Sequence, residues 1–152
     1  NVPMGGDIIQ EKGKNPRFLV WAISDPLGAP LQRVQIIKGW LADGEQREKV
    51  FDVACSDGQS VNPLSHRCPD NGAKVNLDDC SISREKGNAE IKTFWQDPEF
   101  SNDQEAFYYA RVLENPTCRW STWDAVRAKE KPRSDIPVTI QERAWSSPIW
   151  IK

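Results

Sequence analysis

The stretch LQRVQIIKGWLADGEQREKVFDVACS, residues 31–56, decides the fold class, because two runs of alternating side chains flank an Asp-Gly pair. In the first run Val34, Ile36 and Lys38 fall on one side and the intervening residues on the other. This is the period-2 pattern of a strand that is covered on one face. The Asp-Gly pair at 43–44 favours a tight turn. The stretch therefore predicts two antiparallel strands joined by a short loop.

Further strands are predicted on both sides of this hairpin, in segments rich in β-branched and aromatic residues that end at Asp, Asn or Pro. They are RFLVWAISDP (17–26), NAEIKTFWQDP (88–98) and AFYYARVLENP (106–116). Only two short helix starts are found, with Ser101 or Thr122 as the N-cap. Strands that recur without intervening helices predict an all-β, antiparallel, immunoglobulin-like β-sandwich.

Length and charge limit the classes of protein that fit. A chain of 152 residues suits one domain, residues 1–152, and it begins with Asn rather than Met, so we expect a piece of a longer protein. Twenty Lys and Arg are balanced by 22 Asp and Glu and are scattered along the chain. This argues against a nucleic-acid partner. The longest apolar runs are much shorter than the ~20 residues that cross a bilayer, so membrane insertion is not expected.

The four cysteines favour disulfides over a metal site. They are Cys55, Cys68, Cys80 and Cys118, none of which forms a C-x-x-C pair, and His66 is the one histidine. A structural zinc site usually has two closely spaced pairs of ligands. Disulfides indicate an oxidising compartment, although four free thiols in a cytosolic protein remain an alternative.

Two cystine patterns compete, because four cysteines allow several connectivities. Cys118 follows the predicted strand 106–116, so its partner is expected to come from the loop that leaves and rejoins the sheet. We favour Cys55 with Cys68 and Cys80 with Cys118. The alternative joins Cys68 to Cys80 and Cys55 to Cys118.

The segment between these strands, residues 56–87, is a long excursion rich in Gly, Pro, Asn, Asp and Ser. Loops of this length are either functional or disordered. Its aspartates lack the alternating oxygen ligands and the terminal Glu of an EF-hand. We therefore expect a loop of turn residues that is stapled by disulfides.

Motifs that carry chemistry are missing from the sequence. It has no G-x-S-x-G elbow, no Gly-rich phosphate loop and no H-E-x-x-H helix. One histidine leaves few options for a general base or a metal-ligand set. We expect a chain that is not an enzyme, with no cofactor, no metal and no catalytic residues.

Four blocks of the sequence carry a family resemblance. They are VPMGGD (2–7), RFLVWAISDPLGAPLQRVQIIKGW (17–40), FYYARVLENPTCRWSTWDA (107–125) and TIQERAWSSPIWI (139–151). Together they closely resemble the C-terminal part of the bacterial domain-of-unknown-function family 3604. The N-terminal part of that family resembles a PHP-type metal-dependent phosphoesterase with a GDLHxHT-like start, which these residues lack. The resemblance implies an accessory domain whose partner is the catalytic domain of the same parent chain. Many relatives look exported, which implies a periplasmic or secreted location.

The last third of the chain is rich in tryptophan and proline and predicts an irregular tail. Its large aromatic side chains have three interpretations: anchors buried over the sandwich, which we favour, a surface that stacks on sugars, or an interface with the catalytic domain. The interface candidates are Arg119, Trp120, Trp123, Glu142, Arg143, Trp145 and Trp150. For the charged members, internal ion pairs that brace the tail are the alternative.

Two functions follow. The first is a non-catalytic accessory domain that packs on a metal-dependent, phosphoesterase-like hydrolase domain. The second is a stand-alone β-sandwich that binds carbohydrate or another ligand. Burial of the C-terminal tryptophans would exclude stacking by them, whereas an exposed patch favours an interface or a ligand surface.

Overall fold

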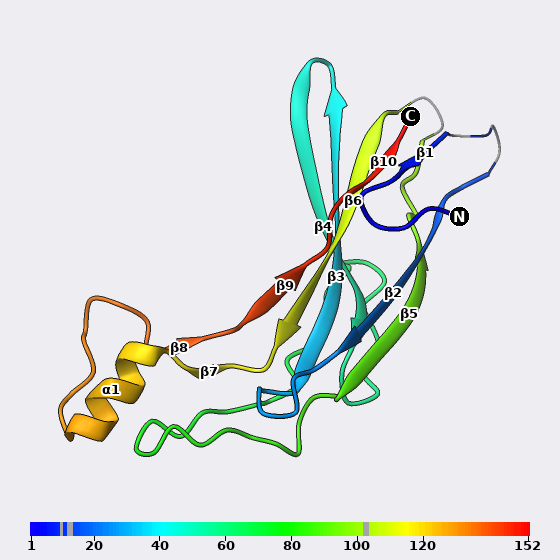
Figure 1. Ribbon diagram of the computed structural model, residues 1–152. Helices are drawn as coiled ribbons and strands as arrows, with labels where there is room; N and C mark the ends of the chain where they lie inside the picture. The colour runs from blue at the N-terminus through cyan, green and yellow to red at the C-terminus, as the bar shows by residue number, and fades with distance from the viewer. Residues whose placement is uncertain (10, 12–13, 102–103) are drawn as a thin grey trace.

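The computed structural model describes residues 1–9, 11, 14–101 and 104–152, and within these the chain is mostly β-structure with one helix. The main sheet has the order β1-β10-β6-β3-β4, and β9 pairs with the remaining part of β6 (Figure 1). Its strands are β1 (Asp7–Ile8), β3 (Leu31–Ala42), β4 (Glu45–Cys55), β6 (Ala106–Glu114), β9 (Arg143–Trp145) and β10 (Ile149–Ile151).

The predicted hairpin is confirmed. Strands β3 and β4 pair antiparallel from Arg33–Cys55 to Ala42–Glu45, with a register shift after Val34. Both turn residues, Asp43 and Gly44, have positive φ angles, of 54° and 78°. Such turns follow the right-handed twist of the strands, which is why Asp-Gly predicts them well.

Strands β2 (Arg17–Ile23) and β5 (Glu90–Gln96) form a separate antiparallel pair, in register from Arg17–Gln96 to Ile23–Glu90. This ribbon packs on one face of the main sheet through the alternate residues of each strand. The Phe18 ring lies 4.7 Å from that of Tyr108 on β6, and Trp95 lies 5.1 Å from Phe51 on β4. The core of the domain is therefore between the ribbon and the main sheet. Lys38 lies on this inner side, as its spacing from Ile36 predicts.

One pair of strands departs from the antiparallel expectation. β1 lies parallel to β10, because the two termini of the chain run side by side at the edge of the main sheet (Figure 1). The main sheet is consequently mixed. None of the described helices is long and apolar enough to span a membrane.

The excursion at 56–87 is held by the two disulfides that we favoured. Cys55 is bonded to Cys68 within its first half, and Cys80 is bonded to Cys118 at the other end. The competing pattern is absent from the structure, in which no cysteine is free. As expected, the segment consists of turns and irregular chain with one isolated bridge, between Val75 and Ile82.

The last third of the chain is more regular than the sequence suggested. β7 (Thr117–Cys118) pairs with β8 (Thr139–Ile140), and helix α1 (Trp120–Ala128) lies between them in sequence. The helix starts at Trp120 with Arg119 as its N-cap, three residues before the start that Thr122 would give as the N-cap. Arg119 contributes no side-chain capping hydrogen bond, so the sequence carries no cap signal there. The other predicted helix start, at Ser101, falls partly on residues 102–103, which lie outside the described residues.

Candidate functional site

The outer face of the β2–β5 ribbon is an exposed apolar surface. Four of its side chains, Leu19, Trp21, Ile23 and Phe94, are between 53% and 69% exposed. They occupy the alternate positions that point away from the core, and the register places Leu19 opposite Phe94. We call these four residues the ribbon face. Large apolar side chains that gather on one surface are typical of interaction sites.

Charged residues border the ribbon face and hold its two aromatic rings. The Glu90 carboxylate accepts a hydrogen bond of 2.6 Å from the Trp21 indole, and Lys92 Nζ lies 5.2 Å from the centre of a Trp21 ring. On the neighbouring position Arg17 lies 5.4 Å from the centre of the Phe94 ring. A cation near a ring face and a hydrogen bond at the ring edge both restrict the rotamer. The surface is therefore ordered although it is exposed.

An open groove of about 1150 Å³ runs beside the same ribbon. It is bounded by β2 on one side and by residues of β6 and β10, such as Tyr109 and Ile149, on the other. Leu19, Trp21 and Phe94 belong to its lining as well. Among the described residues β2 pairs with β5 alone, so its other edge is open toward this groove. The ribbon face and the groove together leave β2 uncovered on two sides.

Sequence reasoning missed this surface, although β2 carries a signal for it. RFLVWAI is apolar at nearly every position, whereas a strand with one solvent-exposed face alternates with polar residues. Continuous apolar runs are typical of strands that are covered on both faces. In this structure one face of β2 is covered by the main sheet and the other is exposed.

The four C-terminal tryptophans are exposed, so the expectation of buried anchors is wrong. Their exposed fractions are 74% for Trp120, 37% for Trp123, 58% for Trp145 and 44% for Trp150. The core is closed instead by Phe18, Phe51, Trp95 and Tyr108. Tryptophan is bulky and often remains partly exposed, and composition alone does not say which members of a set are covered.

The structure divides the interface candidates into two groups. Trp145 and Trp150 lie on the main sheet, where Trp145 is paired with Arg111 and the Trp150 ring lies 5.0 Å from Phe107. Trp120 and Trp123 lie on α1, which projects beyond the β7–β8 pair (Figure 1).

The charged candidates form no internal ion pair within the described residues. Arg119 and Arg143 line a small cleft together with Arg33 of β3, whereas Glu142 is not part of its lining. The alternative interpretation, an internal ion pair between Glu142 and one of these arginines, is not found among the described residues.

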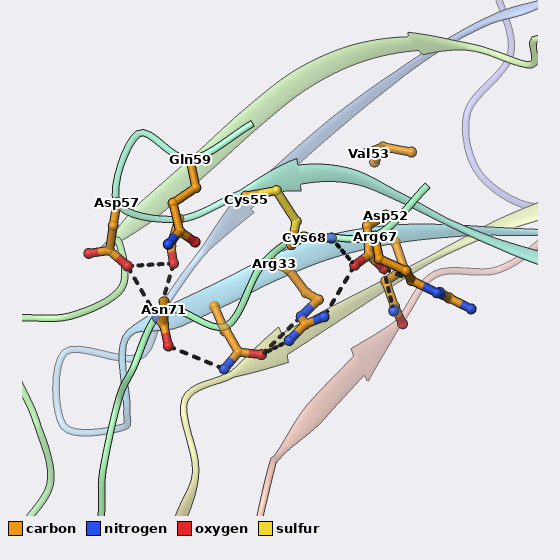
Figure 2. The surroundings of a disulfide bond; sticks show 12 residues. Arg33, Asp52, Val53, Cys55, Asp57, Gln59, Arg67, Cys68 and Asn71 are labelled. Atoms are coloured by element: carbon orange, nitrogen blue, oxygen red, sulfur yellow. Dashed lines mark hydrogen bonds and ion pairs between the residues drawn. A yellow bond between two sulfur atoms is a disulfide. The ribbon is translucent and has the colours of Figure 1, made fainter. Parts of the chain in front are cut away.

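A buried carboxylate organises the nearby polar contacts. Asp52 of β4 accepts hydrogen bonds from Gln35 at 2.7 Å and from the Cys68 backbone N–H at 2.7 Å. Arg33 and Arg67 approach the same carboxylate at 3.2 and 3.5 Å, beside the Cys55–Cys68 disulfide (Figure 2). This network joins the excursion to β3 and β4, so its role is structural.

Family comparison places the whole chain in one group. The family model described as "Protein of unknown function (DUF3604)" matches residues 1–152. The chain belongs to the DUF3604 family. No curated protein and no solved structure matches it.

In this DUF3604 chain the described residues form exposed apolar surfaces and a small cleft. In the described part of the chain, no three His, Cys, Asp or Glu side chains are grouped as metal ligands. His66 contacts the Phe51 ring at 5.1 Å and lies 3.8 Å from the Glu99 carboxylate, which packs it against β4. The candidate interaction surfaces are the ribbon face, the C-terminal tryptophans and the arginine-lined cleft.

Proposed function

We propose that this DUF3604 chain is a non-catalytic accessory domain, immunoglobulin-like in architecture, that packs against a metal-dependent, phosphoesterase-like hydrolase domain of the same parent protein. The observation that carries the proposal is the ribbon face: Leu19, Trp21, Ile23 and Phe94 are apolar, exposed and held in place on regular strands. The identity of the partner domain is inferred from the family resemblance.

Docking of the ribbon face on a partner is favourable because it removes apolar side chains from water. Fully burying one large apolar side chain contributes roughly 1.5–3 kcal/mol relative to leaving it exposed. Four such side chains on one two-stranded ribbon give an apolar centre, and Arg17, Glu90 and Lys92 give a charged border. An apolar centre with a polar rim is the usual anatomy of a protein interface.

The two disulfides support a periplasmic or secreted location for the parent protein. Cystines persist in oxidising compartments and are rare in cytosolic proteins. We include this location in the proposal.

Hydrogen exchange tests this proposal by comparing the β2–β5 ribbon in the full-length parent protein with the ribbon in isolated residues 1–152. We expect the backbone amides of residues 17–23 to exchange at least tenfold more slowly in the full-length parent protein than in isolated residues 1–152. The hairpin tip at 43–48, which is exposed in this structure, serves as the reference segment. Equal exchange rates for 17–23 in both proteins would exclude docking through this face.

A double variant, Trp21→Ser with Phe94→Ser, separates docking from folding. Both side chains are exposed, so the isolated domain should keep its melting temperature within a few degrees. In the full-length protein the same double variant should make the boundary between the domains sensitive to limited proteolysis.

Exposure of Trp145 and Trp150 favours the second candidate, a carbohydrate-binding or other ligand-binding domain. Their rings lie on the main sheet, where they offer apolar surfaces for stacking. Titration of isolated residues 1–152 with neutral oligosaccharides, followed by tryptophan fluorescence, tests this candidate. A saturable change that disappears in Trp145→Ala and Trp150→Ala would support it.

A further inference from the structure

The arginine-lined cleft lies between β3, the end of β7 and the strands that follow α1. It has a volume of about 460 Å³, and Arg33, Arg119 and Arg143 all contribute to its lining. These residues are far apart in the sequence and converge through the pairing of β6 with β3 and β9. The cleft is separate from the ribbon face.

Charge in the cleft is opposite to that of the whole chain. Three arginines and one aspartate, Asp70, line it. Arg33 is paired with the Asp52 carboxylate, so among the described residues the unpaired positive charge belongs to Arg119 and Arg143, whereas the chain has a formal charge of −2. The Asp70 carboxylate accepts a hydrogen bond of 3.0 Å from the Gly72 backbone N–H, so one of its oxygens is already engaged in a turn. The cleft is therefore a local positive site on a mildly acidic domain.

The wall formed by Arg33 is rigid. Its Nε and one terminal nitrogen donate to the Gln32 side-chain oxygen at 2.9 and 2.6 Å, and its other terminal nitrogen lies 3.2 Å from the Asp52 carboxylate. Gln141 donates to the same Gln32 oxygen at 3.0 Å. Gln32 is buried, so this corner of the cleft is built before any ligand arrives.

Two other guanidinium groups keep donors available. Arg119 uses its Nε in a 3.0 Å hydrogen bond to the Pro137 carbonyl, which orients the group and leaves its terminal nitrogens without a partner in the described chain. Within the same residues the Arg143 side chain makes no hydrogen bond or ion pair. Arg119 is also the N-cap of α1, so the positive end of the helix dipole lies beside the cleft.

We propose that this cleft binds the oxyanion of a small organic ligand through Arg119 and Arg143, with Arg33 as the fixed positive wall. Guanidinium groups present paired donors that match carboxylate, phosphate and sulfate oxygens. The volume is many times the ~30 Å³ that one water occupies in the liquid, so it admits more than a bare ion.

Calorimetric titration of residues 1–152 at constant ionic strength tests the proposal with three probes: glucuronate, inorganic phosphate and inorganic sulfate. We expect saturable binding of at least one probe and no heat from glucose. Arg143→Gln should weaken that binding at least tenfold. The matched control is Arg47→Gln, which removes one arginine at the hairpin tip, where Arg47 pairs with Glu45.

The pattern among the probes identifies the oxyanion. Preference for glucuronate assigns a carboxylate, and preference for phosphate or sulfate assigns the corresponding ester. Absence of saturable binding for all three probes would overturn the proposal, and so would equal losses in Arg143→Gln and Arg47→Gln. Circular dichroism of both variants checks that the fold is retained, which we expect because the Arg143 side chain is exposed.

Discussion

Lys38 Nζ lies 2.7 Å from Asp97 Oδ2, and the two side chains are 3% and 0% exposed. Lys38 belongs to β3 of the main sheet, and Asp97 directly follows β5 of the ribbon. Tyr108 donates a 2.7 Å hydrogen bond to the same carboxylate. Burial, together with Asp97, raises the pKa of Tyr108 far above its usual range, so the hydroxyl remains a donor. This contact ties the ribbon to the main sheet inside the core.

Asp97→Ala should lower the free energy of unfolding by about 3–5 kcal/mol, because it leaves the Lys38 ammonium buried without its partner. Urea unfolding followed by tryptophan fluorescence measures the loss. The double variant Lys38→Met with Asp97→Leu removes both charges and should recover a large part of it. An Asp97→Ala protein as stable as the wild type would show that the pair is not buried in solution.

Gly39 is the second site of close packing, on the opposite face of β3. A Cβ atom at this position would lie 2.3 Å from the Phe107 ring, which covers the glycine. Gly39→Ala should therefore destabilise the domain by about 1–3 kcal/mol, the usual cost of overpacking. The same substitution in a Phe107→Ala background should cost much less, since the ring is gone. Thermal unfolding of the four proteins gives the coupling energy, and additive effects would argue against this contact.

The two disulfides should differ in their effect on stability. They join residues 13 and 38 positions apart. In the chain-entropy model the shorter loop contributes about 3 kcal/mol and the longer one about 4 kcal/mol. Paired Cys→Ser variants should therefore lose more stability at Cys80 and Cys118 than at Cys55 and Cys68. Peptide mapping without reduction tests the pairing directly, and a peptide joining Cys55 to Cys118 would contradict it.

Asp57 closes the base of the excursion, because its carboxylate accepts hydrogen bonds of 2.9 and 3.0 Å from the Gly87 backbone N–H. Burial alone would raise the pKa of Asp57, but hydrogen bonds from Ser56, Gly87 and Asn71 outweigh it and hold the pKa below its usual range. A lowered pKa in the folded state stabilises the protein above the pKa of the unfolded chain. That stability is lost as the pH falls through the folded-state pKa.

Asp57→Asn should accordingly be less stable than the wild type at neutral pH, by about 1 kcal/mol because the site is largely solvated. The difference should shrink as the pH falls below about 4, the usual pKa of an aspartate in the unfolded chain, toward the lower pKa of Asp57 in the folded protein. Asparagine tolerates the positive φ angle of 57° at this position, so backbone strain does not confuse the comparison. Urea unfolding at a series of pH values measures this difference in the free energy of unfolding. A difference that stays constant down to pH 2 would contradict the explanation.

Local sequence rules predicted much of the fold because the signals act between neighbours. Alternation together with β-branched and aromatic content identified the segments that become β2, β3, β5 and β6, and Asp43-Gly44 identified the hairpin, since side-chain period, strand propensity and turn chemistry depend on adjacent residues. The favoured cystine pairing matches the structure as well. The start of helix α1 was predicted three residues late because Arg119 provides no capping side chain.

By itself, the sequence determined that this chain is rich in strands, carries a hairpin at 43–44 and has a cysteine-containing excursion. Only the tertiary structure decided which apolar side chains are covered. The ribbon has two strands and covers the main sheet with one face, so Trp21 is exposed whereas Trp95 packs in the core. It also decided that Arg33 and Arg143 line one cleft, because strand order in a sheet depends on long-range pairing that local patterns do not encode.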